Sequence, residues 1–121
     1  MATQRTGFRP LSIRRTDPFC TTEEAWLWFW RCQLAREEGA RIVADAGIVA
    51  RPCDPDDVYR VVVSLYQRGT LSRDHIVILV QYGRILTPPD ERVFEENTDA
   101  QRWDEALDQL TPPLQRKGIV T

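Results

Sequence analysis

The sequence predicts an all-α fold: a single-domain bundle of four main helices with an extended N-terminal arm. Three observations predict it. Apolar residues recur at helical spacing in several segments, helix-capping residues precede those segments, and glycine or proline follows them. The 121 residues suit one domain that buries a core without disulfides or a metal. We divide the chain into an arm over residues 1–20 and a helical domain over residues 21–121.

The first predicted helix begins at Thr21 or Thr22 and runs to Glu38. Thr21 and Glu24 have the spacing of a capping box, in which two side chains satisfy free amide groups at a helix start. Gly39 then offers a stop, or the helix continues to about residue 44. The arm before this helix shows no periodicity. Its apolar residues are expected to pin it onto the body, and these are Phe8, Leu11, Ile13 and Phe19.

The second predicted helix has a clear start in the segment CDPDDVY. Asp54 can cap the helix, and Pro55 suits the first helical position. Valine and leucine residues then fall on one face at helical spacing. Gly69 is expected to end this helix, and Ser72 to cap the third.

The third predicted helix runs from Ser72 to about Leu86 and is apolar nearly all round. Such a helix belongs in the middle of a bundle, where neighbours cover every side. The run HIVILV also suits a buried strand, so residues 76–80 are an alternative strand that would make the fold α+β.

The fourth predicted helix follows an acidic loop over residues 87–97. Thr98 and Gln101 repeat the capping-box spacing. One apolar stripe is formed by Trp103, Ala106, Leu107 and Leu110. The segment TPPLQRKG then predicts a separate short turn, with Pro112 near its start and Gly118 at its end.

Three of the four tryptophans lie inside the first predicted helix, in a stretch of five residues within AWLWFW. At 100° per residue the helix is apolar on two sides. One side holds Ala25, Trp28, Phe29 and Cys32, and the other holds Trp26, Leu27, Trp30 and Leu34. The second side needs a cover, which is the arm, a second copy or another protein. We predict that its four residues form a protein interface; the alternative is a helix enclosed by its own fold.

The sequence shows no pattern of a catalytic or metal site. His75 is the one histidine and has no nucleophile placed beside it, although an enzyme built around it remains an alternative. Cys20, Cys32 and Cys53 with His75 lack the tight pairs of a zinc site. Phosphate-binding and hydrolase motifs are missing. We therefore predict a protein that is not an enzyme and binds no cofactor or metal.

Positive and negative charge lie in different parts of the chain. The arm carries Arg5, Arg9, Arg14 and Arg15 against one aspartate, whereas residues 87–110 are strongly acidic. The arm can serve a partner or lie on the body's acidic end. The second and third helices, joined by RGTLS, also suit a helix-turn-helix that would use these arginines with Arg73 and Arg84. The apolar third helix argues against base reading.

The segments RPCDPDDVYRVVVSLY, LSRDHIVILVQYGR and WDEALDQLTPPLQRKGIV resemble small bacterial helical proteins. They also resemble, more distantly, helical regulators of the phage antiterminator and sigma-like kind. In those regulators too, two helices joined by a short turn precede a segment that contains a tyrosine, as Tyr82-Gly83 does here. The resemblance spans about residues 21–120 and implies a role near transcription, but the apolar third helix departs from it.

The composition sets the compartment and the class of partner. Three cysteines without paired spacing favour a reducing, cytoplasmic compartment. No apolar run approaches the length of a membrane span. Our leading prediction is a non-enzymatic interaction or regulatory module that binds a protein partner or itself through the first helix. A nucleic-acid-associated transcription regulator is the alternative.

Overall fold

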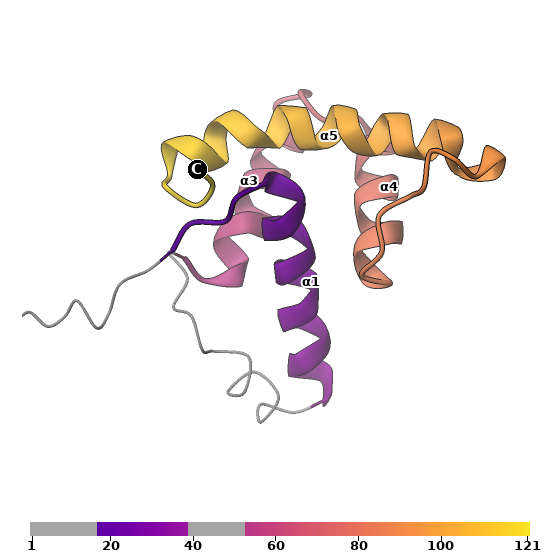
Figure 1. Ribbon diagram of the computed structural model, residues 1–121. Coiled ribbons are helices and arrows are strands. Elements are labelled where there is room, and N and C mark those ends of the chain that lie inside the picture. Colours follow the sequence, from indigo (N-terminus) through magenta and orange to yellow (C-terminus); the bar gives the residue numbers. More distant parts are fainter. Residues whose placement is uncertain (1–16, 39–52) are drawn as a thin grey trace, which may run out of the picture.

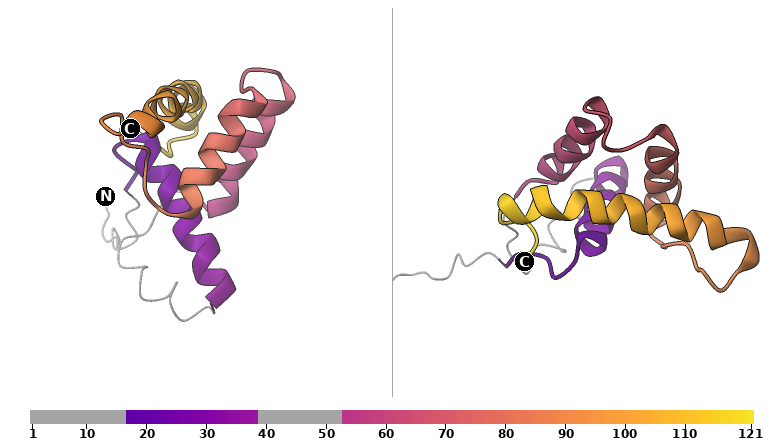
Figure 2. Two further views of the ribbon diagram at one scale, coloured as in Figure 1. Left: turned by 90° about the vertical axis from the view of Figure 1, so that its right-hand side faces the viewer. Right: turned by 90° about the horizontal axis from the view of Figure 1, so that it is seen from above.

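The computed structural model describes residues 17–38 and 53–121. Within them the elements are α1 (Thr22–Glu38), α3 (Pro55–Gln67), α4 (Arg73–Arg84), the 3-10 turn η2 (Phe94–Glu96) and α5 (Asn97–Arg116). The all-α prediction is confirmed for these residues, and residues 76–80 are helical, so the strand alternative is wrong. The long α5 lies across α1, α3 and α4 instead of alongside them (Figures 1 and 2).

Side chains cap the starts of α1 and α4 at the residues that the sequence predicts. The predicted cap at Thr98 is wrong, because α5 begins at Asn97 after Glu96 and has no side-chain cap. At α1 the Glu24 amide donates to the Thr21 hydroxyl (3.1 Å), but the Glu24 carboxylate accepts from the Cys20 amide (2.9 Å) instead of from Thr21. At α4 the capping box is complete with an unexpected partner. The His75 amide donates to the Ser72 hydroxyl (3.2 Å), and the Ser72 amide donates to His75 Nδ1 (3.1 Å).

Three helices end in the same way, with one residue in the left-handed region. Gly69 (φ 82°) follows α3 and Gly118 (φ 76°) follows α5, as glycine at these positions predicts. After α4 the same position is held by Leu86 (φ 56°). There the Leu86 amide donates to the Gly83 carbonyl (2.9 Å) and the Thr87 amide to the Tyr82 carbonyl (3.2 Å). The fold therefore forces a leucine into a conformation that glycine prefers.

The prediction of a separate turn after the fourth helix is wrong, because α5 continues through Pro112 and Pro113 to Arg116. Each proline removes a helical hydrogen bond, which favours a break. The apolar stripe nevertheless continues: Leu110 and Leu114 are both fully buried. Packing against the other helices therefore outweighs the local preference.

The expectation that the third helix lies in the middle of a bundle is also wrong. One side of α4 is buried, through Ile78, Leu79 and Tyr82. The other side faces solvent, with Val77 49% and Ile85 61% exposed. Among residues 17–38 and 53–121, an apolar surface is thus left open on α4, because α1, α3 and α5 do not enclose it.

Phe19 belongs to the core of the described domain. Its side chain is 1% exposed, and its backbone pairs with the C-terminal residues through Phe19 N–H to Ile119 O (2.8 Å) and Thr121 N–H to Phe19 O (3.0 Å). Its predicted role as an anchor is confirmed. The rest of the predicted arm, residues 1–16 with Phe8, Leu11 and Ile13, lies outside the described residues.

Candidate functional site

Trp26 is a core residue, which corrects its predicted place in a surface interface. It is 1% exposed, and its indole N–H donates to the carbonyl oxygen of Leu79 at 2.8 Å. Its ring stacks on Phe29 with centroids 5.3 Å apart. The helices α3, α4 and α5 all contact α1, so more than one face of α1 is covered. The prediction of one buried side and one open side of this helix is therefore wrong at Trp26.

The other three predicted interface residues, Leu27, Trp30 and Leu34, are only half buried. Trp30 meets Trp26 edge to face, with ring centroids 6.0 Å apart. It lies directly against the backbone of α4 at Gly83, where a methyl group would overlap the indole ring. The absence of a side chain at Gly83 is therefore what lets α1 and α4 approach so closely here. The Trp30 indole N–H is buried there without a hydrogen-bond partner among the described residues.

A groove of about 620 Å³ runs between α1 and α4, and we call it the α1–α4 groove. Its apolar lining consists of Trp30, Leu34, Ile76, Val77, Val80 and Ile85, and its polar lining of Glu37, Gln81 and Arg84. Two of the predicted interface residues thus meet the exposed side of α4. The sequence missed the α4 contribution, since that helix was expected to be enclosed.

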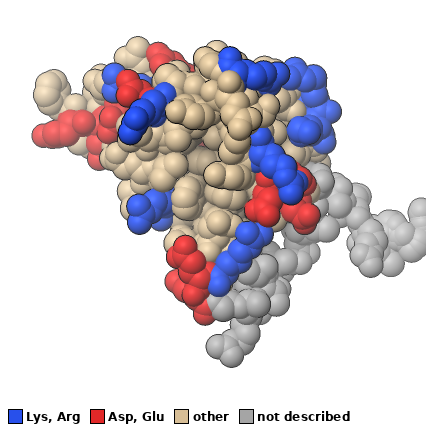
Figure 3. Space-filling view, turned by 180° about the vertical axis from the view of Figure 1, so that it is seen from behind, with Lys and Arg blue, Asp and Glu red and all other residues tan. Residues whose placement is uncertain are grey.

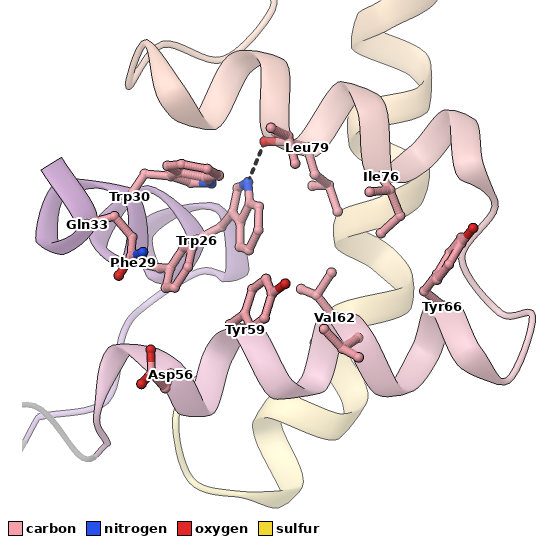
Figure 4. Close-up of a pocket in the computed structure, with 12 residues that line it drawn as sticks. Trp26, Phe29, Trp30, Gln33, Asp56, Tyr59, Val62, Tyr66, Ile76 and Leu79 are labelled. Carbon is pink, nitrogen blue, oxygen red and sulfur yellow. Dashed lines mark hydrogen bonds between the residues drawn. The ribbon is translucent and has the colours of Figure 1, made fainter.

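A second hollow of about 470 Å³, the inner pocket, opens between α1, α3 and α4 (Figure 4). It shares Trp30, Ile76 and Val80 with the α1–α4 groove, so these three side chains separate the two hollows. Tyr59 of α3 stacks on Phe29 at 5.7 Å and is half exposed. Together the hollows form one apolar surface that spans three helices.

The arginines of the helix-turn-helix prediction are only partly described. Arg73 and Arg84 are exposed at the two ends of α4, on the same side of it, about 16 Å apart at 1.5 Å per residue. Arg84 also lines the α1–α4 groove. The predicted nucleic-acid residues of the arm lie outside the described residues, namely Arg5, Arg9, Arg14 and Arg15.

His75 has structural hydrogen bonds on both ring nitrogens. Nδ1 accepts from the Ser72 amide, so Nε2 carries the proton and donates to a Glu105 carboxylate oxygen at 3.1 Å. This hydrogen bond lowers the pKa of Glu105. The bonds link the start of α4 to α5 and use both nitrogens of the only imidazole.

The described residues hold no cluster of three or more histidine, cysteine or acidic side chains suited to a metal ion. All three cysteines are free thiols. Burial, followed by the carboxylates of Asp57 and Asp54, raises the pKa of the Cys53 thiol to about 11. At neutral pH this thiol is therefore protonated and a poor nucleophile.

No protein-family model, curated protein or solved structure matches the chain. The similarity to helical regulators accordingly stays a prediction. In the described part of the chain, none of the helices has the length and apolar character that crossing a bilayer requires.

Proposed function

We propose that this protein is a non-enzymatic interaction module whose docking surface is the α1–α4 groove. The observation that carries the proposal is the row of apolar side chains that α1 and α4 leave open together. Trp30 supplies a broad rigid ring to its lining, and tryptophan is among the residue types most enriched at binding hot spots. Val77 and Ile85 contribute large exposed apolar area on the α4 side. Single exposed apolar residues are ordinary, but a continuous hollow lined by six apolar side chains is typical of a binding site.

The occupant that we propose is an amphipathic helix of a partner protein. A groove between two helices accepts an apolar helix face, with anchors at positions i, i+3, i+4 and i+7. Glu37 and Arg84 give the lining one charge of each sign, so charged residues on the partner helix can pair with both. A second copy fits less well, because a twofold contact would place hollow against hollow. The free thiols suit a reducing compartment, so we place the interaction in the cytoplasm.

A designed peptide tests the groove directly. The probe is a 14-residue amphipathic helix with leucine at i, i+3, i+4 and i+7 and mixed lysine and glutamate elsewhere, titrated into the 15N-labelled chain. We expect shifts at the Trp30 indole N–H and along the exposed side of α4. Val77→Glu should abolish them, because it places a charge in the apolar lining.

Val93→Glu is the matched control, since it makes the same change at an exposed valine outside the groove. Binding that survives Val77→Glu, or that Val93→Glu removes equally, would contradict the proposal. Light scattering measures the molar mass and so tests whether a second copy of the chain occupies the groove. A dimer that Val77→Glu dissociates would assign the groove to that second copy.

A helix-turn-helix regulator is the second candidate, and one observation favours it. The helix after the turn, α4, has an exposed side that carries Arg73, Gln81 and Arg84. The same side also carries the apolar lining of the groove, and these side chains cannot form hydrogen bonds with the polar edges of DNA bases. Duplex DNA binding that weakens steeply with salt and is lost in Arg73→Gln/Arg84→Gln would favour this candidate over a protein partner.

A further inference from the structure

We infer that the protein has a second, separate site: a basic hollow between α3 and the end of α5 that binds a small ligand with linked phosphate groups. The hollow measures about 460 Å³. It is lined by Arg60, Val61 and Ser64 of α3 with Arg68 at the C-cap of that helix, and by Pro113, Arg116 and Lys117 at the end of α5. This inference does not depend on the proposed docking function, because the two sites have no lining residue in common.

Four cationic side chains meet here in a chain whose acidic residues outnumber its basic ones, 18 to 16. In the space-filling view, basic side chains gather over the end of α5 and the adjoining part of α3, at the upper right (Figure 3). Of these four side chains only Arg60 has a carboxylate partner within the described residues, Asp57 at 2.8 Å. Arg68, Arg116 and Lys117 make no ion pair there, so most of the positive charge is not neutralised by the described chain.

Helix ends explain part of this arrangement. Arg68, Arg116 and Lys117 stand at the C-terminal ends of α3 and α5, where the helix dipoles favour positive charge. The dipoles do not explain Arg60, which lies near the middle of α3. They also do not explain why the two helix ends face one hollow, because like charges brought together repel. A bound anion would remove that repulsion.

The number and spacing of the cations indicate the class of anion. Arg60, Ser64 and Arg68 follow one another at intervals of four residues, so they share one side of α3 over about 12 Å. Arg116 and Lys117 face them from α5. A single phosphate group carries a charge of only about −1.5 to −2 and cannot match the three cations that lack a carboxylate partner, which lie on two sides of the hollow. Two or three linked phosphates match both the charge and the length, and arginine forks bind such oxygens in pairs.

Tripolyphosphate is the probe that tests this site, measured by isothermal titration calorimetry on the full chain at constant ionic strength. We expect the double variant Arg116→Gln/Lys117→Gln to weaken binding at least tenfold. The matched control is Arg73→Gln/Arg84→Gln, which removes the same charge from exposed positions on α4 and should change the affinity less than twofold. Circular dichroism confirms that each variant is folded, since all four side chains are exposed.

Three results would overturn the inference. Equal weakening by both double variants would mean unspecific attraction to total charge. No binding of tripolyphosphate by the wild-type chain would mean that the cations only stabilise helix ends. Binding of a 20-base-pair DNA duplex at these residues without any binding of tripolyphosphate would replace the small ligand with a nucleic-acid backbone. None of these results bears on the groove, which the peptide titration tests separately.

Discussion

The contact of Trp30 with the α4 backbone makes a strong prediction about Gly83→Ala. At an ordinary helix position this change stabilises by up to about 1 kcal/mol, because alanine has the higher helix propensity. Here the added methyl group overlaps the Trp30 indole and lies 3.1 Å from Trp26 Nε1. Overpacking of this kind costs about 1–3 kcal/mol. Because the propensity gain of up to about 1 kcal/mol offsets part of this cost, we expect Gly83→Ala to lower the free energy of unfolding by up to about 2 kcal/mol.

The sign of the effect should depend on the tryptophan. In a Trp30→Ala background the main overlap is gone, and only the close approach to Trp26 remains. Gly83→Ala should then be neutral or stabilise by up to about 1 kcal/mol. The two changes are therefore coupled by about 2 kcal/mol, far more than independent sites show.

Urea unfolding followed by circular dichroism at 222 nm measures this cycle without using tryptophan emission. Gly69→Ala is the control: Gly69 has φ 82° and open space around its Cα, so its cost of about 1–2 kcal/mol comes from the backbone alone and should be equal in both backgrounds. If Gly83→Ala had the same effect with and without Trp30, to within about 0.5 kcal/mol, the close packing of α1 on α4 would be refuted.

Two further predictions concern single residues of α4 and the segment after it. At Leu86 (φ 56°) we expect Leu86→Val to destabilise more than Leu86→Gly in urea unfolding, because a branched side chain adds to left-handed strain that glycine removes; the usual order, with glycine worse, would show that Leu86 is not strained. Tyr82 donates to Asp99 at 2.6 Å, and burial and this bond raise its pKa from 10.0 to about 12. The folded phenol thus keeps a proton that the unfolded chain loses, so the free energy of unfolding should fall as pH rises from about 10 to 12. Tyr82→Phe should cost about 1–2 kcal/mol at pH 8 and abolish this part of the alkaline loss, and an unchanged loss would contradict the assignment.

The sequence by itself determined the helices and most of their ends. The residues that start or end helices depend only on the neighbouring backbone, so the sequence alone reveals them. They are Asp54 and Ser72 at helix starts and Gly69 and Gly118 after helix ends. The apolar stripe of α5 was equally visible, because periodicity of 3.6 residues does not depend on what the stripe packs against. The same periodicity placed Trp30 and Leu34 together on one apolar side of the first helix.

Only the tertiary structure decided which apolar faces are covered. The burial of Trp26 and the exposure of Val77 depend on where α3, α4 and α5 cross α1, and these crossings involve residues far apart in sequence. The same holds for α5 beyond Pro112, where Leu110, Leu114 and Ile119 are all buried and together offset the two missing hydrogen bonds. The basic hollow joins residues 60–68 to residues 113–117. Local preferences are worth up to about 1 kcal/mol for most residues, whereas burial of a large side chain is worth about 2–3 kcal/mol. Packing therefore decides against such a preference with one buried side chain, and against a proline, at about 3 kcal/mol, with several.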